Sequence, residues 1–174
     1  MADIDREIAE AQDLMISGNF PGAVKKYAKI IKANPGSAEA YFGKAEAAIG
    51  DSSVGVEEVI ACYKKALDLD IKNPLYWSSY AVYLIEQGKF DEAENAYNKA
   101  AESDPDNARY YYSEFGVEYA LRGPASMRGF IEGKELDDQM KAVLQKKEEG
   151  IKKKALHYIL KSIDMTEADV KKLL

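Results

Sequence analysis

Apolar and polar residues alternate with helical spacing between Tyr76 and Pro105, and this stretch predicts two helices joined by a turn. In the first helix, apolar residues recur three and four positions apart, which places them on one face. They are Trp77, Tyr80, Ala81, Leu84 and Ile85. The second helix has the same spacing at Phe90, Ala93, Ala96, Tyr97 and Ala100. Because Gly88 can adopt the left-handed conformation and Pro105 cannot continue a helix, we expect a helical hairpin with a turn at Gly88.

The same pattern occurs three times along the chain. The step between the first and third copies is seventy residues at every matched position, for example from Tyr27 to Tyr97. A middle copy lies between them, with Tyr63 thirty-four residues before Tyr97 and Tyr41 thirty-six residues before Trp77. The period is therefore thirty-four residues, with two residues inserted in the middle copy near residues 50–53.

A helix-turn-helix period of this length, with aromatic, small, Gly and Pro positions in this order, resembles the tetratricopeptide repeat (TPR) family. The resemblance covers roughly residues 4–121. It implies an all-α fold, a right-handed superhelix of about three and a half TPR hairpins followed by C-terminal helices. The array is expected over residues 1–121. Its repeats fall at about 4–37, 38–73 and 74–107, with a half repeat at 108–121.

The chain departs from this pattern after Leu121. Arg122-Gly123-Pro124 and two later glycines predict an irregular connection over residues 122–133. Residues 134–174 predict a C-terminal helical extension that packs on the array or caps it. Gly150 either separates two helices there or lies inside one long helix, and Thr166 with Asp169 has the spacing of a capping box before a last short helix.

The charge distribution and the single cysteine limit the possible ligands and the cellular location. The formal net charge of the 174 residues is −6, with −8 over residues 1–133 and +2 over residues 134–174. An acidic array argues against nucleic acid as a ligand, because phosphates bind to clustered Lys and Arg. No apolar run is long enough to cross a membrane, so no membrane association is expected. The single cysteine, Cys62, cannot form an intramolecular disulfide, which favours a cytoplasmic location.

Residues with catalytic potential are few. His157 is the one histidine, so a site with several histidines cannot be built. Adjacent carboxylate pairs such as Glu57-Glu58 point to different sides of a helix and are typical of a solvated surface. There is no glycine-rich phosphate-binding loop after a strand. We therefore expect no enzymatic activity, no metal site and no cofactor.

The TPR resemblance implies a concave groove lined by the first helix of each repeat. The positions that would face it are Ile8, Gln12, Met15, Phe42, Glu46, Ile49, Ser78, Val82, Ile85, Arg109, Tyr112, Gly116 and Tyr119. This wall is largely apolar and contains aromatics, which is typical of a surface where another chain docks. The family's best-known variant grips a C-terminal carboxylate with cationic side chains. The matching positions here carry no positive charge, so a carboxylate-clamp chaperone binder is not expected: Ile8, Gln12, Gly43, Leu75 and Ser79.

The sequence therefore predicts a protein–protein interaction scaffold that binds a partner peptide or helix in an apolar, aromatic-containing groove. One alternative is that its own C-terminal helix fills the groove, which would make the module structural or autoinhibited. Self-association through the repeats is another, and a monomer or a weak homodimer is expected. A further alternative is a non-catalytic accessory subunit of an enzyme such as a glycosyltransferase. The sequence leaves the identity of the partner open.

Overall fold

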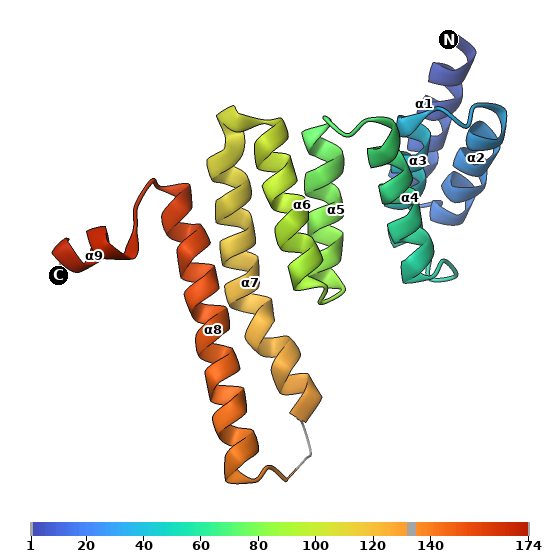
Figure 1. Cartoon of the computed structure of the whole chain (residues 1–174). Coiled ribbons are helices and arrows are strands. Elements are labelled where there is room, and N and C mark those ends of the chain that lie inside the picture. The colour runs from blue at the N-terminus through green and yellow to red at the C-terminus, as the bar shows by residue number, and fades with distance from the viewer. Residues whose placement is uncertain (1, 132–134, 174) are drawn as a thin grey trace. The chain divides into compact units, whose positions relative to one another are not determined.

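A computed structural model describes residues 2–131 and 135–173 of the chain, and every regular element among them is helical (Figure 1). The all-α fold expected from the sequence is confirmed. The chain forms two compact units, Met1–Tyr76 and Trp77–Leu174, which are described in turn. The helices are α1 (Ala2–Ile16), α2 (Phe20–Ala33), α3 (Ala38–Ile49), α4 (Val56–Leu69), α5 (Pro74–Glu86), α6 (Phe90–Ser103), α7 (Ala108–Ile131), α8 (Asp138–Ser162) and α9 (Glu167–Leu173), with a short 3₁₀ helix at Pro105–Asn107.

The first unit contains two helical hairpins, α1–α2 and α3–α4, with α2 packed against α3. Alanines with no exposed surface lie where these helices meet: Ala11, Ala23, Ala40 and Ala45. Because a methyl group lets two backbones approach closely, larger apolar residues such as Tyr27 and Ile30 can fill the space on either side, and both are 1% exposed. Tertiary packing of this kind supplies most of the stability of helices this short.

The turns of the first and third hairpins follow the sequence prediction. Gly18 and Gly88 have φ values of 78° and 70°, which lie in the left-handed region that favours glycine. At the third hairpin, the amide of Gly88 donates to the carbonyl of Ile85 at 3.0 Å and the amide of Lys89 donates to that of Leu84 at 2.9 Å. These bonds satisfy carbonyls at the end of α5 and reverse the chain into α6.

In the second unit, the predicted apolar faces of α5 and α6 are buried, with two exceptions. Most positions of the two stripes are at most 5% exposed: Tyr80, Ala81, Leu84, Ile85, Ala93, Ala96, Tyr97 and Ala100. Trp77 and Phe90, which the spacing placed on these faces, are half-buried. The pattern therefore identifies the packed faces correctly, but the first residue of each is only partly buried.

The connection after Leu121 differs from the sequence prediction. Helix α7 continues through residues 122–131, where an irregular connection was expected, and includes Pro124 in its interior. Residues 132–134 lie outside the described residues. Gly123 is buried, and a Cβ added there would lie 2.8 Å from Cγ2 of Ile151 on α8. Close packing on α8 accompanies the longer helix, so tertiary contact overrides the local helix-breaking signal of Gly123 and Pro124.

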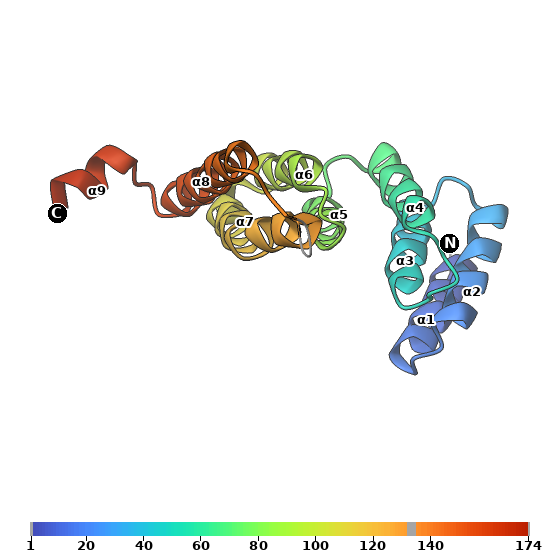
Figure 2. The same cartoon turned by 90° about the horizontal axis from the view of Figure 1, so that it is seen from below.

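Helices α7 and α8 form a long antiparallel hairpin (Figure 1). Helix α8 runs unbroken through Gly150, so of the two readings left open by the sequence the single long helix is the observed one. Figure 2 shows α8 on the same side of the unit as α6, with α5 and α7 on the other side. Helix α8 thus takes the place of the second helix of a fourth hairpin.

The last helix begins with the predicted capping box. The amide of Thr166 donates to Oδ2 of Asp169 at 3.0 Å, and the amide of Asp169 donates to Oγ1 of Thr166 at 3.3 Å. Each side chain therefore satisfies an amide at the start of α9 that has no partner within the helix.

Candidate functional site

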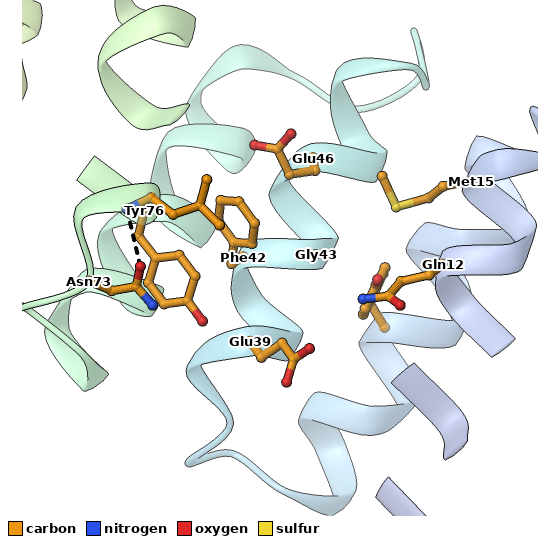
Figure 3. Close-up of a pocket in the computed structure, with 10 residues that line it drawn as sticks. Gln12, Met15, Glu39, Phe42, Gly43, Glu46, Asn73 and Tyr76 are labelled. Atoms are coloured by element: carbon orange, nitrogen blue, oxygen red, sulfur yellow. Dashed lines mark hydrogen bonds between the residues drawn. The ribbon is translucent and has the colours of Figure 1, made fainter. Parts of the chain in front are cut away.

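A pocket of about 300 Å³ lies along α3 in the first unit (Figure 3). It is lined by residues of α1 and α3, by Tyr27 of α2, and by residues from the loop after α4 into the first turn of α5. The lining residues are Gln12, Met15, Tyr27, Glu39, Phe42, Gly43, Glu46, Asn73, Leu75 and Tyr76. All of them belong to the first unit, so this pocket is complete within one compact body.

The apolar part of the pocket is built on stacked aromatic rings. The ring of Phe42 lies 4.6 Å from that of Tyr76 with an interplanar angle of 26°, and 6.1 Å from the ring of Tyr63 in an edge contact. Offset and edge contacts of this kind are favourable for aromatic pairs and hold each ring in place. Leu75, which is 56% exposed, and half-buried Met15 add aliphatic surface. The pocket therefore offers a preformed apolar surface rather than a flexible one.

Gly43 lets the aromatic ring of α2 reach this pocket. A Cβ added at Gly43 would lie 2.4 Å from Cζ of Tyr27, closer than side-chain atoms approach one another. The absence of a side chain at residue 43 therefore allows the buried Tyr27 ring to pack directly against the backbone of α3. The bottom of the pocket is fixed by this contact between α2 and α3.

The charged side chains that line the pocket are two glutamates on one face of α3. The hydroxyl of Tyr63 donates a hydrogen bond to Oε1 of Glu46, which positions that carboxylate. Burial raises the pKa of Tyr27 to about 12, and the charge of Glu39 adds to this shift. Burial also raises the pKa of Tyr76, with further contributions from Glu39 and Asp70. The negative charge of Glu39 is thus felt at both tyrosines of the pocket.

Four of the residues predicted to face a groove come together here: Gln12, Met15, Phe42 and Glu46. Two others of the same repeats do not line the pocket. Ile8 is 5% exposed and belongs to the core, while Ile49 is 46% exposed at the end of α3. Gly43 and Leu75, which the family resemblance placed at clamp positions, do line the pocket and carry no charge.

The sequence prediction missed four lining residues, Glu39, Asn73, Tyr76 and Tyr27. Glu39 lies one helical turn before Phe42, so a complete reading of the α3 face would have included it. Asn73 and Tyr76 come from the loop and first turn that follow α4, where the repeat pattern says little about side-chain direction. Tyr27 is 1% exposed and reaches the pocket because residue 43 is glycine.

In the third repeat, the predicted groove residues on α5 have three different environments. Ser78 is half-buried, Val82 is 38% exposed and Ile85 is 2% exposed. Of these, Val82 is the one that offers apolar surface to solvent.

The predicted groove residues on α7 contact α8. Arg109 forms an ion pair with Asp164, which follows α8. The Tyr112 ring lies 6.0 Å from that of Tyr158, and the ammonium of Lys161 lies 3.7 Å above the Tyr112 ring. These positions were expected to line an open groove. In the structure α8 packs against Tyr112, while the Arg109 side chain is 69% exposed.

The other two predicted positions of α7 are also close to α8. A Cβ added at Gly116 would lie 2.8 Å from Cγ1 of Ile159 and 3.0 Å from the carbonyl oxygen of Ala155. Tyr119 is 9% exposed, and the ammonium of Lys154 lies 5.7 Å from the centroid of its ring. Glycine at residue 116 is what allows the backbones of α7 and α8 to approach at this point.

Polar contacts also join α8 to α6. The ammonium of Lys154 donates to Oε2 of Glu94 at 2.7 Å, and the hydroxyl of Tyr158 donates to Oε1 of the same carboxylate at 2.9 Å. The side-chain Nδ2 of Asn98 donates in turn to the Tyr158 hydroxyl at 2.9 Å. The hydrogen bond to Glu94 raises the pKa of Lys154, since it favours the charged ammonium. Helix α8 is thus held to its neighbours by both packing and hydrogen bonds.

The described residues offer few groups suited to metal binding or nucleophilic chemistry. No group of three or more His, Cys, Asp or Glu side chains there is arranged to hold a metal ion. Cys62 is buried, and burial raises the pKa of its thiol, which lowers its reactivity as a nucleophile. No helix within the described residues has the length and apolar character needed to span a membrane.

Family models place this chain among known proteins. Two tetratricopeptide repeat models match it, one over residues 8–74 and the other over residues 74–107. The two matches together cover more than half of the chain and agree with the helical hairpins in the structure. The chain belongs to the tetratricopeptide repeat family, whose members are protein-interaction modules.

A relative with known repeats agrees with this assignment. The chain is 31% identical over 113 residues to the small glutamine-rich tetratricopeptide repeat-containing protein 2 of Mycosarcoma maydis. That match covers 59% of this chain and 31% of the relative, so the chain spans about a third of the relative's length.

Solved structures with much lower sequence identity share the fold. The crystal structure of MamA superposes with a TM-score of 0.67 at 17% identity, over 97% of this chain and 81% of that one. The Yersinia enterocolitica type III secretion chaperone SycD, in complex with a peptide of the translocator YopD, gives a TM-score of 0.56 at 17% identity, over 88% and 95%. At these identities the likeness shows the fold alone.

Proposed function

We propose that this chain is a protein-interaction scaffold and that the pocket along α3 receives a peptide or helical segment of its partner. The observation that carries the proposal is a preformed apolar surface left open to solvent, built on the stacked rings of Phe42 and Tyr76. Aromatic side chains held in place lose little conformational freedom on binding, and such residues are enriched where proteins bind one another.

The fold supports a peptide as the kind of ligand. A structural neighbour, SycD, is described in complex with a peptide of a translocator, so a TPR fold of this general form accommodates a peptide. The pocket also lacks a Lys or Arg among its described lining residues, in keeping with the expectation that this chain is not a carboxylate clamp. A non-catalytic role, a cytoplasmic setting and a monomer or weak homodimer complete the proposal.

Selection from a library of short random peptides displayed on phage tests the proposal, with the purified chain as bait. Gln12→Trp fills the pocket from its exposed rim on α1, and Phe42→Ala removes the stacked ring. Peptides selected by the unmodified chain should bind both variants at least about tenfold more weakly, because the loss of one buried anchor contact exceeds 1.4 kcal/mol at such sites. Fluorescence anisotropy with the selected peptides measures the affinities.

The matched control is Ala9→Trp, which places the same bulky residue at an exposed position of α1 that does not line the pocket. It should leave the affinities unchanged. Circular dichroism confirms that each variant keeps its helical content. If every selected peptide binds Gln12→Trp and Phe42→Ala as tightly as the unmodified chain, the pocket is not the docking site and the proposal is wrong.

A further inference from the structure

The two glutamates of the pocket lie on either side of its apolar part. Glu39 and Glu46 are seven residues apart on α3, so about 10 Å of helix axis separates them. Figure 3 shows the two carboxylates toward opposite ends of the labelled stretch of α3, with Phe42 and Gly43 between them. A segment that lies along α3 over the Phe42 ring therefore meets a carboxylate near each end.

The nearest basic residue of the same helix is directed elsewhere. Lys44 is the only lysine of α3, and its ammonium donates to Oε1 of Glu58 on α4 at 2.9 Å. Its side chain is 18% exposed, so it is held beside α4 and does not line the pocket. The charge of the pocket lining is accordingly negative, and the charge of Glu39 reaches the hydroxyls of Tyr27 and Tyr76.

This combination of rings and carboxylates suits one kind of side chain in particular. Lys and Arg have aliphatic stems that pack on apolar surface while their charged ends reach polar groups. A cation also interacts favourably with the face of a tyrosine or phenylalanine ring. An acidic residue at the same place would meet two like charges and would be disfavoured.

We propose that the partner segment bound by this pocket carries an apolar anchor residue with a Lys or Arg about one helical turn away. The anchor packs on Phe42 and Leu75, and the cation reaches Glu39 or Glu46. This inference rests on the function proposed above, and it names the chemistry of the ligand at that same site.

The phage-selected peptides test the inference. Peptides that depend on the pocket should be enriched in Lys and Arg relative to the starting library and depleted in Asp and Glu. In synthetic versions of the strongest peptide, Gln in place of a basic residue should weaken binding roughly 2- to 5-fold per residue replaced, because exposed ion pairs have modest strength. Glu in the same places should weaken binding further.

A double variant of the chain tests whether the preference for basic peptides arises at the two pocket glutamates. Glu39→Gln with Glu46→Gln keeps the size of both side chains and leaves an oxygen that can accept from Tyr63. It should bind the basic and the Gln-substituted peptides with nearly equal affinity. The control, Asp13→Asn with Asp68→Asn, removes the same amount of charge from exposed positions outside the pocket and should keep the preference for the basic peptide.

The outcomes separate this inference from the proposed function. If selected peptides depend on Phe42 but show no basic enrichment, or bind equally well with Gln for Lys, the pocket is a docking site and the charge inference is wrong. If both double variants lose the preference equally, net charge rather than the pocket is responsible, and the inference is again wrong. If no selected peptide depends on Phe42, the proposed function fails and the inference fails with it.

Discussion

Equivalent positions of the second and fourth repeats have opposite environments. Glu39, Phe42 and Glu46 of α3 stand seventy residues before Arg109, Tyr112 and Gly116 of α7, the same step that relates the first and third repeats. The α3 residues line an open pocket, whereas Tyr112 and Gly116 of α7 pack against α8 and the exposed Arg109 pairs with Asp164 just after α8. One structural position of the repeat is thus used for an open surface in one unit and for internal packing in the other.

The side chains at these positions account for the difference. Gly116 stands where α3 has Glu46, and the absence of a Cβ allows Ile159 and the backbone of Ala155 to lie against α7. Arg109 stands where α3 has Glu39, and its positive charge can pair with Asp164. A glutamate at residue 116 would clash with α8, and one at residue 109 would repel the Asp164 carboxylate. At Gly116 the groove wall of a TPR therefore becomes an internal surface through the loss of one side chain, and the change of charge at Arg109 adds an ion pair at the surface.

The largest effect is expected when the α3 residue is placed at the equivalent position of α7. Gly116→Glu places a charged side chain against Ile159 and Ala155, and the free energy of unfolding should fall by about 2–4 kcal/mol from overpacking and desolvation of the carboxylate. Urea denaturation followed by circular dichroism measures it. Val117→Glu, one residue along and 43% exposed, is the control and should change stability by less than about 0.5 kcal/mol. Equal effects of the two substitutions would mean that α8 does not cover Gly116.

A second change weakens the contact of α8 with α6 without altering its packing. Tyr158→Phe removes a hydroxyl that donates to Glu94 and accepts from Asn98, so it should lower the free energy of unfolding by about 1–2 kcal/mol. The same denaturation experiment applies. Tyr110→Phe, at a residue that is 59% exposed and bonded to Glu114 at 3.2 Å, should have a much smaller effect. If Tyr158→Phe is as mild as Tyr110→Phe, these hydrogen bonds do not hold α8 in place.

The repeat pattern predicts the fold well because it records packing between neighbouring helices. The left-handed turn at Gly88 and the capping box at Thr166 both depend on residues close together in the sequence. The length of α7 could not be predicted in this way. Gly123 and Pro124 are local signals for the end of a helix, and contact with Ile151 of α8, far along the chain, accompanies the opposite outcome.

The candidate site was predicted only in part, because the repeat period shows which residues share a helix face but not what packs on that face. Gln12, Met15, Phe42 and Glu46 share the face that the period assigns to a groove, and the structure brings them into one pocket. The period cannot indicate that a later helix covers the equivalent face of α7, since nothing in one repeat specifies what packs on it from outside. Phe115 is a local sign that another helix packs here. It stands thirty-four residues after Ala81, where the third repeat has a small residue, and its ring lies 4.7 Å from that of Tyr158.

The smallest effect is expected at Gly150, inside α8, where a substitution should stabilise the helix that packs on α7. A Cβ added at Gly150 meets no atom within 4 Å, so Gly150→Ala should raise the free energy of unfolding by about 0.5–1 kcal/mol, because alanine loses less backbone entropy in a helix than glycine does. Gly116→Ala is the matched control and should have the opposite sign, since its Cβ would lie 2.8 Å from Ile159. Urea denaturation of both variants gives the two signs, and amide hydrogen exchange shows whether protection rises along α8. A loss of stability in Gly150→Ala would show that α8 is not a continuous helix at this residue.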